Sequence, residues 1–175
     1  MRDIDPDSPV YKDPVGLRII DLSEMLESTL VLFHGRIAIQ HIEVQRRLPE
    51  GVCVEASEGE LRQVVVNLIG NALDAMPKGG LLILRVRRTS FVAGASTGVA
   101  LTIADSGHGM TPEVKSRIFE AFYTTKADAG NGIGLWLSLE IVRKHRAKML
   151  LKSAPGRGTA FAIVFPQNGA GSYIA

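Results

Sequence analysis

The spacing of apolar residues along the chain predicts a mixture of helices and strands. Apolar side chains recur every three or four positions in a run that opens at Asp21 and reaches Phe33, and again over 58–76 and 135–145. This is the period of an amphipathic helix. Shorter apolar runs bounded by turn residues indicate strands. These runs lie at 42–48, 52–56, 81–89, 98–104, 148–153 and 159–165.

Polar residues at the predicted helix starts define where the helices begin. Asp21 stands three positions before Glu24, and Ser57 stands three positions before Glu60. This spacing is typical of a capping box, in which the first side chain caps the helix and the glutamate returns a hydrogen bond. The pair Thr111-Pro112 predicts a further short helix, with threonine as the cap and proline at the first helical position.

The order of these elements predicts an α/β (α+β) two-layer sandwich. We expect one mixed, largely antiparallel sheet of about five strands with helices on one face. The domain is expected to occupy 17–166, with 1–16 as a Pro-rich and Asp-rich linker or lead-in and 167–175 as a loose tail. The long connection from Gly109 to Gly130 holds only one short helix. Such a connection predicts a mobile lid.

Composition and charge exclude several classes of function. The 20 Lys and Arg against 18 Asp and Glu leave a formal net charge of +2, which gives no basic stripe for a phosphate backbone, so we expect no nucleic-acid partner. The single cysteine, Cys53, cannot form an internal disulfide, which fits a reducing compartment. No run approaches the roughly 18 apolar residues of a membrane helix. We therefore expect a cytoplasmic domain without membrane contact.

The predicted helix over 58–76 carries a polar stripe opposite its apolar face. At about 100° per residue, the side chains that gather there are Gln63, Asn67, Asn71 and Asp74. A carboxamide oxygen on this stripe could coordinate Mg²⁺, which prefers hard oxygen ligands beside substrate phosphates. The alternative is a solvated helix face, which globular proteins commonly show.

An aspartate followed by glycines stands directly after a predicted strand, in Asp105-Ser106-Gly107-His108-Gly109. Gly107 and Gly109 allow a turn that approaches a planar ligand closely. The Asp105 carboxylate is an acceptor-only group, so it can accept from the amino group of adenine, whereas guanine presents an oxygen at that position. The alternative is a glycine-rich turn with a capping aspartate.

A third glycine motif, Gly130-x-Gly132-x-Gly134, leads into the helix at 135–145. Unpaired amides and the helix dipole favour a phosphate group at such a helix start. The motif is neither a Walker A loop, because no Gly-x-x-x-x-Gly-Lys-[Ser/Thr] occurs, nor a dinucleotide fingerprint, because no strand precedes it.

Together these motifs resemble the five boxes of one family. Gln63-x-x-x-Asn67-Leu68-Ile69-x-Asn71-Ala72-x-Asp74-Ala75 resembles the N box, and Asp105-x-Gly107-x-Gly109 resembles the G1 box. Ile118-Phe119-Glu120-x-Phe122-Tyr123-Thr124-Thr125-Lys126 resembles the F box, and Gly130-x-Gly132-Ile133-Gly134-Leu135 the G2 box. Ser153-x-Pro155-Gly156-x-Gly158-Thr159-x-Phe161 resembles the last glycine motif. Over about 17–166 the chain resembles the ATP-binding catalytic domain of two-component sensor histidine kinases, in the superfamily of gyrase, heat-shock chaperone and mismatch-repair ATPases.

The resemblance implies a role for each matching residue. Asp105 reads adenine, Asn71 holds Mg²⁺, and Gly132 and Gly134 cradle the phosphates, while Lys126 approaches the terminal phosphate from the lid. The resemblance also implies nucleotide contacts for further residues of the boxes. These are Asp74, Gly107, Gly109, Phe119, Phe122, Gly130, Leu135 and Thr159.

Two aromatic residues of the F box and one amide of the N box have more specific expected roles. Phe119 and Phe122 are expected to form a hydrophobic latch between the lid and the body of the domain, or simply to bury a short helix. Asn67 occupies the place where the ATP-hydrolysing relatives carry a glutamate that activates water. An amide takes no proton at neutral pH, so rapid hydrolysis is disfavoured and a kinase is favoured.

The chain departs from the family pattern in two places. The family shows His followed by small residues, mostly Gly, where this chain has His145-Arg146-Ala147, so a tight turn could be altered. The family's phosphoacceptor histidine stands on an upstream hairpin, and none of His34, His41, His108 or His145 has that context. We expect structural roles for all four histidines.

The resemblance predicts binding of Mg·ATP and transfer of its γ-phosphoryl group to a histidine on a separate dimerisation and phosphoacceptor segment, with a response regulator downstream. Without the dimerising hairpin, a monomer is expected. Two other functions stay open, a non-catalytic nucleotide-responsive interaction module and a self-sufficient ATPase switch. The amide at Asn67 argues against the switch.

Two basic clusters have expectations of their own. Arg143, Lys144, His145, Arg146 and Lys148 stand at a predicted helix C-terminus, where the dipole favours solvated cations. Arg85, Arg87 and Arg88 are expected on the solvated face of a sheet edge.

Overall fold

The computed structural model describes residues 16–90, 97–124 and 132–166. In chain order its elements are β1 (Leu17–Asp21), α1 (Leu22–Val31), α2 (His34–Ile39), β2 (Ile42–Arg47), β3 (Cys53–Ser57), α3 (Glu58–Asp74), β4 (Gly80–Ser90), β5 (Thr97–Asp105), α4 (Pro112–Arg117), α5 (Gly134–Lys144), β6 (Lys148–Ser153) and β7 (Thr159–Pro166). No helix among these residues is long and apolar enough to cross a membrane.

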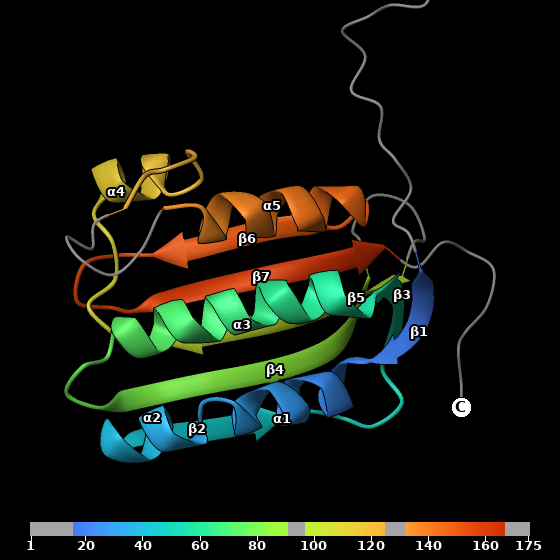
Figure 1. The fold of residues 1–175 in the computed structure, drawn as a ribbon, viewed down its shortest axis with the longest axis horizontal. Helices are drawn as coiled ribbons and strands as arrows, with labels where there is room; N and C mark the ends of the chain where they lie inside the picture. Colours follow the sequence, from blue (N-terminus) through green and yellow to red (C-terminus); the bar gives the residue numbers. More distant parts are fainter. Residues whose placement is uncertain (1–15, 91–96, 125–131, 167–175) are drawn as a thin grey trace, which may run out of the picture.

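The main sheet has five strands in the order β2-β4-β5-β7-β6. Its neighbours pair antiparallel except β2 and β4, which are parallel. Helices α1, α3 and α5 lie across one face of this sheet, side by side in Figure 1. The predicted two-layer α/β sandwich with a mixed sheet of about five strands is therefore confirmed.

The hydrophobic core lies between this sheet and the helices. Alternate residues of a strand point to opposite faces, and one set on the central strands is buried against α3. The strand residues are Leu82, Leu84, Val86, Val99, Leu101, Ile103, Phe161, Ile163 and Phe165, and the α3 residues are Leu61, Val65, Leu68, Ile69 and Leu73. The apolar stripe predicted for α3 is thus its core-facing side.

The start of α1 agrees with its predicted cap, and its end does not agree with the predicted length. Asp21 accepts hydrogen bonds from the N–H groups of Ser23 and Glu24. The helix ends at Val31, two residues before Phe33, and the short helix α2 follows, which the sequence pattern did not predict. At six residues, α2 is too short for a periodic pattern to separate it from a loop.

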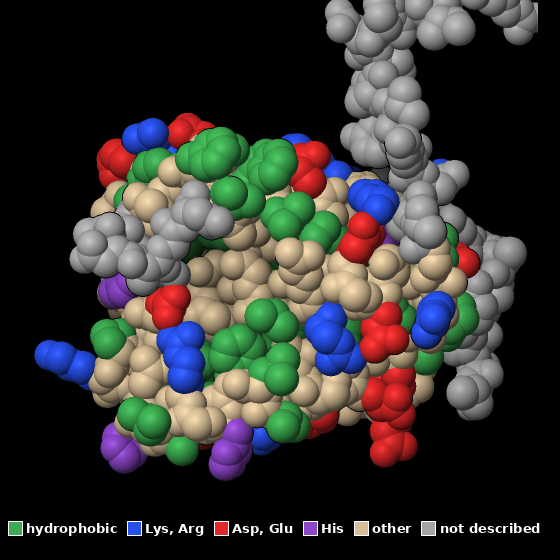
Figure 2. All heavy atoms as spheres, in the orientation of Figure 1, with side chains coloured by type: hydrophobic (Ala, Val, Ile, Leu, Met, Phe, Trp, Pro, Cys, Tyr) green, Lys and Arg blue, Asp and Glu red, His purple; other side chains and the backbone are tan. Residues whose placement is uncertain are grey.

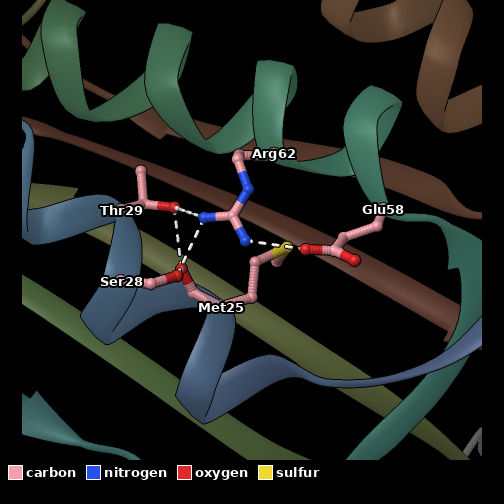
Figure 3. Close-up of polar contacts among 5 residues, drawn as sticks. All are labelled: Met25, Ser28, Thr29, Glu58 and Arg62. Atoms are coloured by element: carbon pink, nitrogen blue, oxygen red, sulfur yellow. Dashed lines mark hydrogen bonds and ion pairs between the residues drawn. The ribbon is translucent and has the colours of Figure 1, made fainter.

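A single arginine joins α1 to α3 (Figure 3). Arg62 of α3 donates to the hydroxyls of Ser28 and Thr29 on α1, at 2.8 and 3.2 Å, and also pairs with Glu58. The same hydroxyl groups donate to the carbonyl oxygen of Met25. This network fixes the N-terminal half of α3 against α1.

The capping box predicted at the start of α3 is wrong. Ser57 is the N-cap residue, but its side chain makes no capping hydrogen bond. Its N–H donates instead to Nε2 of His145, at 2.9 Å, and Glu60 forms an ion pair with Lys144. His145, at the end of α5, therefore accepts the N–H of Ser57 that Glu60 was expected to accept. Sequence spacing could not show this because residues from the far end of the domain intervene.

The basic cluster after α5 is only partly a solvated cap. Lys144 is paired with Glu60, and the His145 side chain is 2% exposed. The structural role expected for His145 is confirmed, because its Nδ1 also contacts the carbonyl oxygen of Ile141, at 2.8 Å. Arg146 adopts φ +54°, a left-handed conformation that glycine adopts most readily. The chain therefore makes a left-handed turn here with an arginine in place of glycine.

Strands 42–48 and 52–56 are confirmed as elements, but they belong to different sheets. β3 pairs with β1 in a separate two-stranded sheet, and β2 pairs with β4. β1 was not predicted as a strand. Arg85, Arg87 and Arg88 are exposed as expected, but their expected place at a sheet edge is wrong, because β4 lies inside the sheet and β2 forms the edge. Arg88 points to the helix side and donates to the carbonyl oxygen of Gly51.

Candidate functional site

The motifs identified in the sequence meet at one end of the sheet. α3 and β5 end there and α5 begins there, at the left side of Figure 1. Two of these junctions are close backbone contacts. The N–H of His108 donates to the carbonyl oxygen of Ala75, at 3.2 Å, and the N–H of Gly156 donates to the carbonyl oxygen of His108, at 2.7 Å. The fold thus brings the N, G1, G2 and last glycine motifs together.

Asp105, the predicted adenine reader, is half-buried and held by two backbone groups. Its Oδ1 accepts from the N–H of Gly107, at 2.9 Å, and of Thr159, at 3.2 Å. Burial raises the pKa of the carboxyl group, while these two hydrogen bonds and the nearby His108 oppose the rise. No described residue donates to Oδ2, so this oxygen is available to a ligand. The geometry is that of a rigid acceptor at the end of a strand.

The glycines around Asp105 are required by contacts within the protein itself. A Cβ on Gly107 would lie 2.5 Å from the carbonyl oxygen of Ala75, and one on Gly158 would lie 2.8 Å from the carbonyl carbon of Asp105. Gly109, at φ +67°, would place a Cβ 2.8 Å from the carbonyl carbon of Ala154. The sequence suggested that Gly107 and Gly109 allow approach of a planar ligand. In the structure they let the G1 turn pack against α3 and the β6–β7 turn.

Asn67 faces the start of α5 and is already engaged there. Its Nδ2 donates to Oγ of Ser138, at 2.9 Å, and that hydroxyl donates to the carbonyl oxygen of Gly134, also at 2.9 Å. A Cβ on Gly134 would lie 2.9 Å from Cγ of Asn67. Ser138 is 2% exposed, so this contact excludes water. The pair fixes the N-terminal end of α5 against the N box.

Sequence reasoning did not identify Ser138 as a site residue. A serine four positions after Gly134 reads as an ordinary helix residue, and its role depends on Asn67, which is 71 positions away in the chain. The spacing Gly134-x-x-x-Ser138 was the available signal, since a hydroxyl can return to the carbonyl group four residues earlier. Thr159 was identified, although the structure shows its backbone N–H as the group that contacts Asp105.

Asn71 and Asp74 of the α3 stripe lie one and two turns beyond Asn67, and Gln63, one turn before it, is exposed. Asn71 is half-buried, and its carboxamide follows Asn67 on the same side of the helix. Asp74 is more exposed and accepts from Nη2 of Arg36 on α2, at 2.6 Å. The role of Asn71 as a magnesium ligand stays a prediction. The described residues contain no cluster of three or more His, Cys, Asp or Glu side chains that could hold a metal ion by themselves.

A backbone contact joins described residues on the two sides of the segment 125–131. The N–H of Phe122 donates to the carbonyl oxygen of Gly132, at 3.1 Å, and Gly132 has φ +66°. Phe119 packs against the core, while Phe122 is 74% exposed at φ +67°. Simple burial is therefore wrong for Phe122, and its latch role stays a prediction. Lys126 and Gly130 lie outside the described residues. Leu135 is half-buried against the core.

Comparison with known proteins gives concordant matches. Residues 56–169 match the family model described as histidine kinase-, DNA gyrase B-, and HSP90-like ATPase. The chain is 31% identical to sporulation kinase C of Bacillus subtilis (strain 168) over 147 residues, which cover 83% of this chain and 33% of that protein. It is 34% identical to sensor histidine kinase ZraS of Klebsiella oxytoca over 151 residues, which cover 86% and 31%.

A solved structure of the catalytic domain of histidine kinase ThkA is similar with a TM-score of 0.75 and 25% identity, covering 87% of this chain and 96% of that one. The chain thus spans about a third of the length of the two curated relatives and nearly all of the solved domain.

Proposed function

This chain belongs to the histidine kinase-, DNA gyrase B-, and HSP90-like ATPase family, and we propose that it is the ATP-binding catalytic domain of a sensor histidine kinase. The observation that carries the proposal is the Asp105 carboxylate. One oxygen is fixed by the N–H groups of Gly107 and Thr159, and the other is available to a ligand. Such an acceptor favours the amino group of adenine over the carbonyl oxygen of guanine.

The start of α5 supports the placement of the phosphates. Gly132 and Gly134 stand at its N-terminus, where free N–H groups and the helix dipole favour negative charge. The contact of Gly134 with Asn67 and Ser138 holds this end of the helix in place. Gly130 and Lys126, from the adjoining lid, would add further contacts to the phosphates.

The protein residues at this site fit a magnesium ion that is bound mainly through the nucleotide. Asn71 would supply one oxygen ligand, and the phosphate oxygens and water would supply the others, as is usual for Mg²⁺. When bound, the ion would neutralise charge that develops on the phosphates. Asp74, which is paired with Arg36, would act on the site from a greater distance.

Asn67 supports phosphoryl transfer over hydrolysis. A carboxamide does not accept a proton near neutral pH, and here its NH₂ group is used by Ser138. Water therefore has no general base at this position, and ATP would be kept until a histidine nitrogen of a partner segment attacks the γ-phosphorus. In that transfer the bond to the β–γ bridging oxygen breaks and ADP leaves. Positioning and charge neutralisation supply most of the rate in such reactions.

The acceptor histidine is proposed to lie outside this chain. His145 is buried and bonded to Ser57 and Ile141. Nδ1 of His108 contacts the carbonyl oxygen of Gly109, at 2.7 Å. A response regulator would then receive the phosphoryl group from the acceptor segment. We place the catalytic domain at 17–166 and its site of action in the cytoplasm.

The decisive test supplies a phosphoacceptor hairpin in trans together with γ-labelled ATP and Mg²⁺. Label on histidine, lost in acid and stable in base, is expected. An Asn71→Ala variant should transfer little label while keeping its fold. Label on serine would contradict histidine transfer, and absence of transfer despite tight Mg·ATP binding would favour the non-catalytic interaction module. Release of phosphate at several turnovers per second by the isolated chain would instead indicate an ATPase switch.

A further inference from the structure

The face of the main sheet opposite the helices is apolar along its two central strands. A solvated sheet face normally carries polar side chains. On β5 and β7 the residues that point away from the helices are instead small and almost all apolar. They are Thr102, Ala104, Ala160 and Ala162, which are partly exposed, and Ala100 and Val164, which are only 3% and 8% exposed. We call this surface, together with the same side of β4 and β6, the helix-free face.

Cationic side chains border the small residues on both sides. On β4 the residues of this face include Leu81, Ile83, Arg85 and Arg87, and on β6 they are Lys148, Leu150 and Lys152. The strand register places Arg85, Thr102, Ala162 and Leu150 in one row across the sheet. The neighbouring rows run from Arg87 to Lys148 and from Ile83 to Lys152. Two cationic rims therefore enclose a floor of small residues.

The four cations of this face are exposed, and none forms an ion pair with a described residue. They are Arg85, Arg87, Lys148 and Lys152. The helix side of the molecule differs, because its cations are matched by acids. Arg36, Arg62 and Lys144 each pair with a carboxylate there, and Figure 2 shows basic and acidic side chains next to one another on that side. On the helix-free face, the edge strand β2 adds Arg47 beside Arg85 and contributes one acid, Glu43, beside Leu81. The positive charge of this face is thus largely uncompensated.

The dimensions of the helix-free face suit a single helix. Neighbouring strands lie about 4.8 Å apart, so β4 and β6, which are separated by β5 and β7, lie about 14 Å apart. An α-helix with its side chains is about 10–12 Å across. Arginine and lysine side chains extend several ångströms beyond alanine, so the two rims stand higher than the floor. Leu150, at 56% exposed, adds apolar surface beside one rim.

We propose that the helix-free face is a docking surface for an acidic amphipathic helix of a partner protein. The apolar stripe of that helix would lie on the partly exposed alanines of β5 and β7, which are Ala104, Ala160 and Ala162. Its Asp and Glu residues, on both borders of the stripe, would pair with Arg85 and Arg87 on one side and with Lys148 and Lys152 on the other. Docking there would cover the second face of the sheet, as helices do in three-layer α/β proteins. A nucleic-acid strand is a poorer fit, because the floor offers no aromatic side chain on which bases could stack.

The test uses a stapled 15-residue helix with an Ala/Leu stripe bordered by Glu as the probe. Titrated into the ¹⁵N-labelled full chain, it should bind with a Kd in the micromolar range. The amide shifts should change at Ala104, Ala160 and Ala162. The double variant Arg85→Glu/Lys152→Glu should weaken binding at least tenfold. A matched variant, Arg18→Glu/Lys78→Glu, reverses two exposed cations outside this face and should bind the probe as the wild type does.

Several results would overturn the proposal. One is equal binding of a peptide in which every Glu is replaced by Lys. Others are shift changes on the helix side, an affinity unchanged by Arg85→Glu/Lys152→Glu, or no binding at all. Tighter binding of a single-stranded DNA oligonucleotide, or self-association through this face in sedimentation, would assign the face to a polyanion or to a second copy. All variants should keep wild-type Mg·ATP affinity, which shows that they are folded and separates this test from that of the proposed function.

Discussion

Replacing Asp105 by Asn should weaken binding of adenine nucleotides while leaving the fold intact. In the wild type, Oδ1 accepts from the N–H groups of Gly107 and Thr159, and Oδ2 is assigned to the amino group of adenine. Asparagine has one acceptor oxygen and one NH₂ group. It can satisfy the two backbone donors or the adenine amino group, but not both.

The expected size of the effect follows from this conflict. Losing a hydrogen bond to a charged acceptor raises the free energy of binding by about 1–3 kcal/mol, so the Kd for ATP should rise roughly 5- to 150-fold. The NH₂ group can also donate to the carbonyl oxygen of guanine. Discrimination between ATP and GTP should therefore fall together with the ATP affinity, which a merely structural defect would not produce.

The same substitution should raise the stability of the protein without nucleotide. Burial raises the pKa of Asp105 above its ordinary value, so the folded protein binds a proton there more tightly than the unfolded chain does. The free energy of unfolding therefore falls as the pH rises from the pKa of this carboxyl group in the unfolded chain through its pKa in the folded protein. At neutral pH the whole of this loss is present. The asparagine side chain of the variant does not titrate. The variant without nucleotide should melt higher than the wild type at pH 7, and this difference should shrink in acid.

The assay is isothermal titration with Mg·ATP and Mg·GTP, combined with thermal melts between pH 3 and pH 7. Asp21→Asn is the matched control, because Asp21 also accepts backbone N–H groups, from Ser23 and Gly51, yet lies at the start of α1. It should leave nucleotide affinity unchanged. Unaltered ATP affinity in the Asp105 variant, or an equal loss in both variants, would refute the adenine assignment.

Two other substitutions test how the site is built. Gly158→Ala would force a Cβ against the Asp105 carbonyl group at φ +71°, so in urea titrations it should lower stability by more than the roughly 1–2 kcal/mol of left-handed strain alone. Gly51→Ala, at φ +69° with nothing within 4 Å, should show only that strain, and equal losses would contradict the packing role. Ser138→Ala removes the acceptor of Asn67 and should lower stability by about 1–3 kcal/mol. In the double variant with Asn67→Ala the losses should not add, whereas additive losses would show that the two side chains are uncoupled.

The sequence predicted the elements that depend on local chemistry. Asp21 caps α1 as its spacing indicated, and Thr111 caps α4 by accepting from the N–H of Val114. The polar stripe of α3 and its apolar side also follow from the helical period alone. The glycine motifs were recognisable because each requires a backbone conformation or approach that other residues do not allow.

Features that depend on distant residues could not be predicted in this way. Ser57 and Glu60 have the spacing of a capping box, but His145 and Lys144 compete successfully for the same groups. The pairing of β1 with β3 and of β2 with β4 is set by packing, because each strand alone is compatible with several neighbours. The bond between Asn67 and Ser138 spans 71 positions, and neither residue type indicates its partner.

The hydrogen bond from Phe122 to Gly132 has a consequence for how this domain can diversify. Because this bond holds Phe122 next to Gly132, the chain between them is a loop whose two ends are fixed by the described fold. Doubling the length of a closed loop adds only about 0.6 kcal/mol of closure entropy. Changing the number of residues between Phe122 and Gly132 should therefore alter the free energy of unfolding of this domain only slightly.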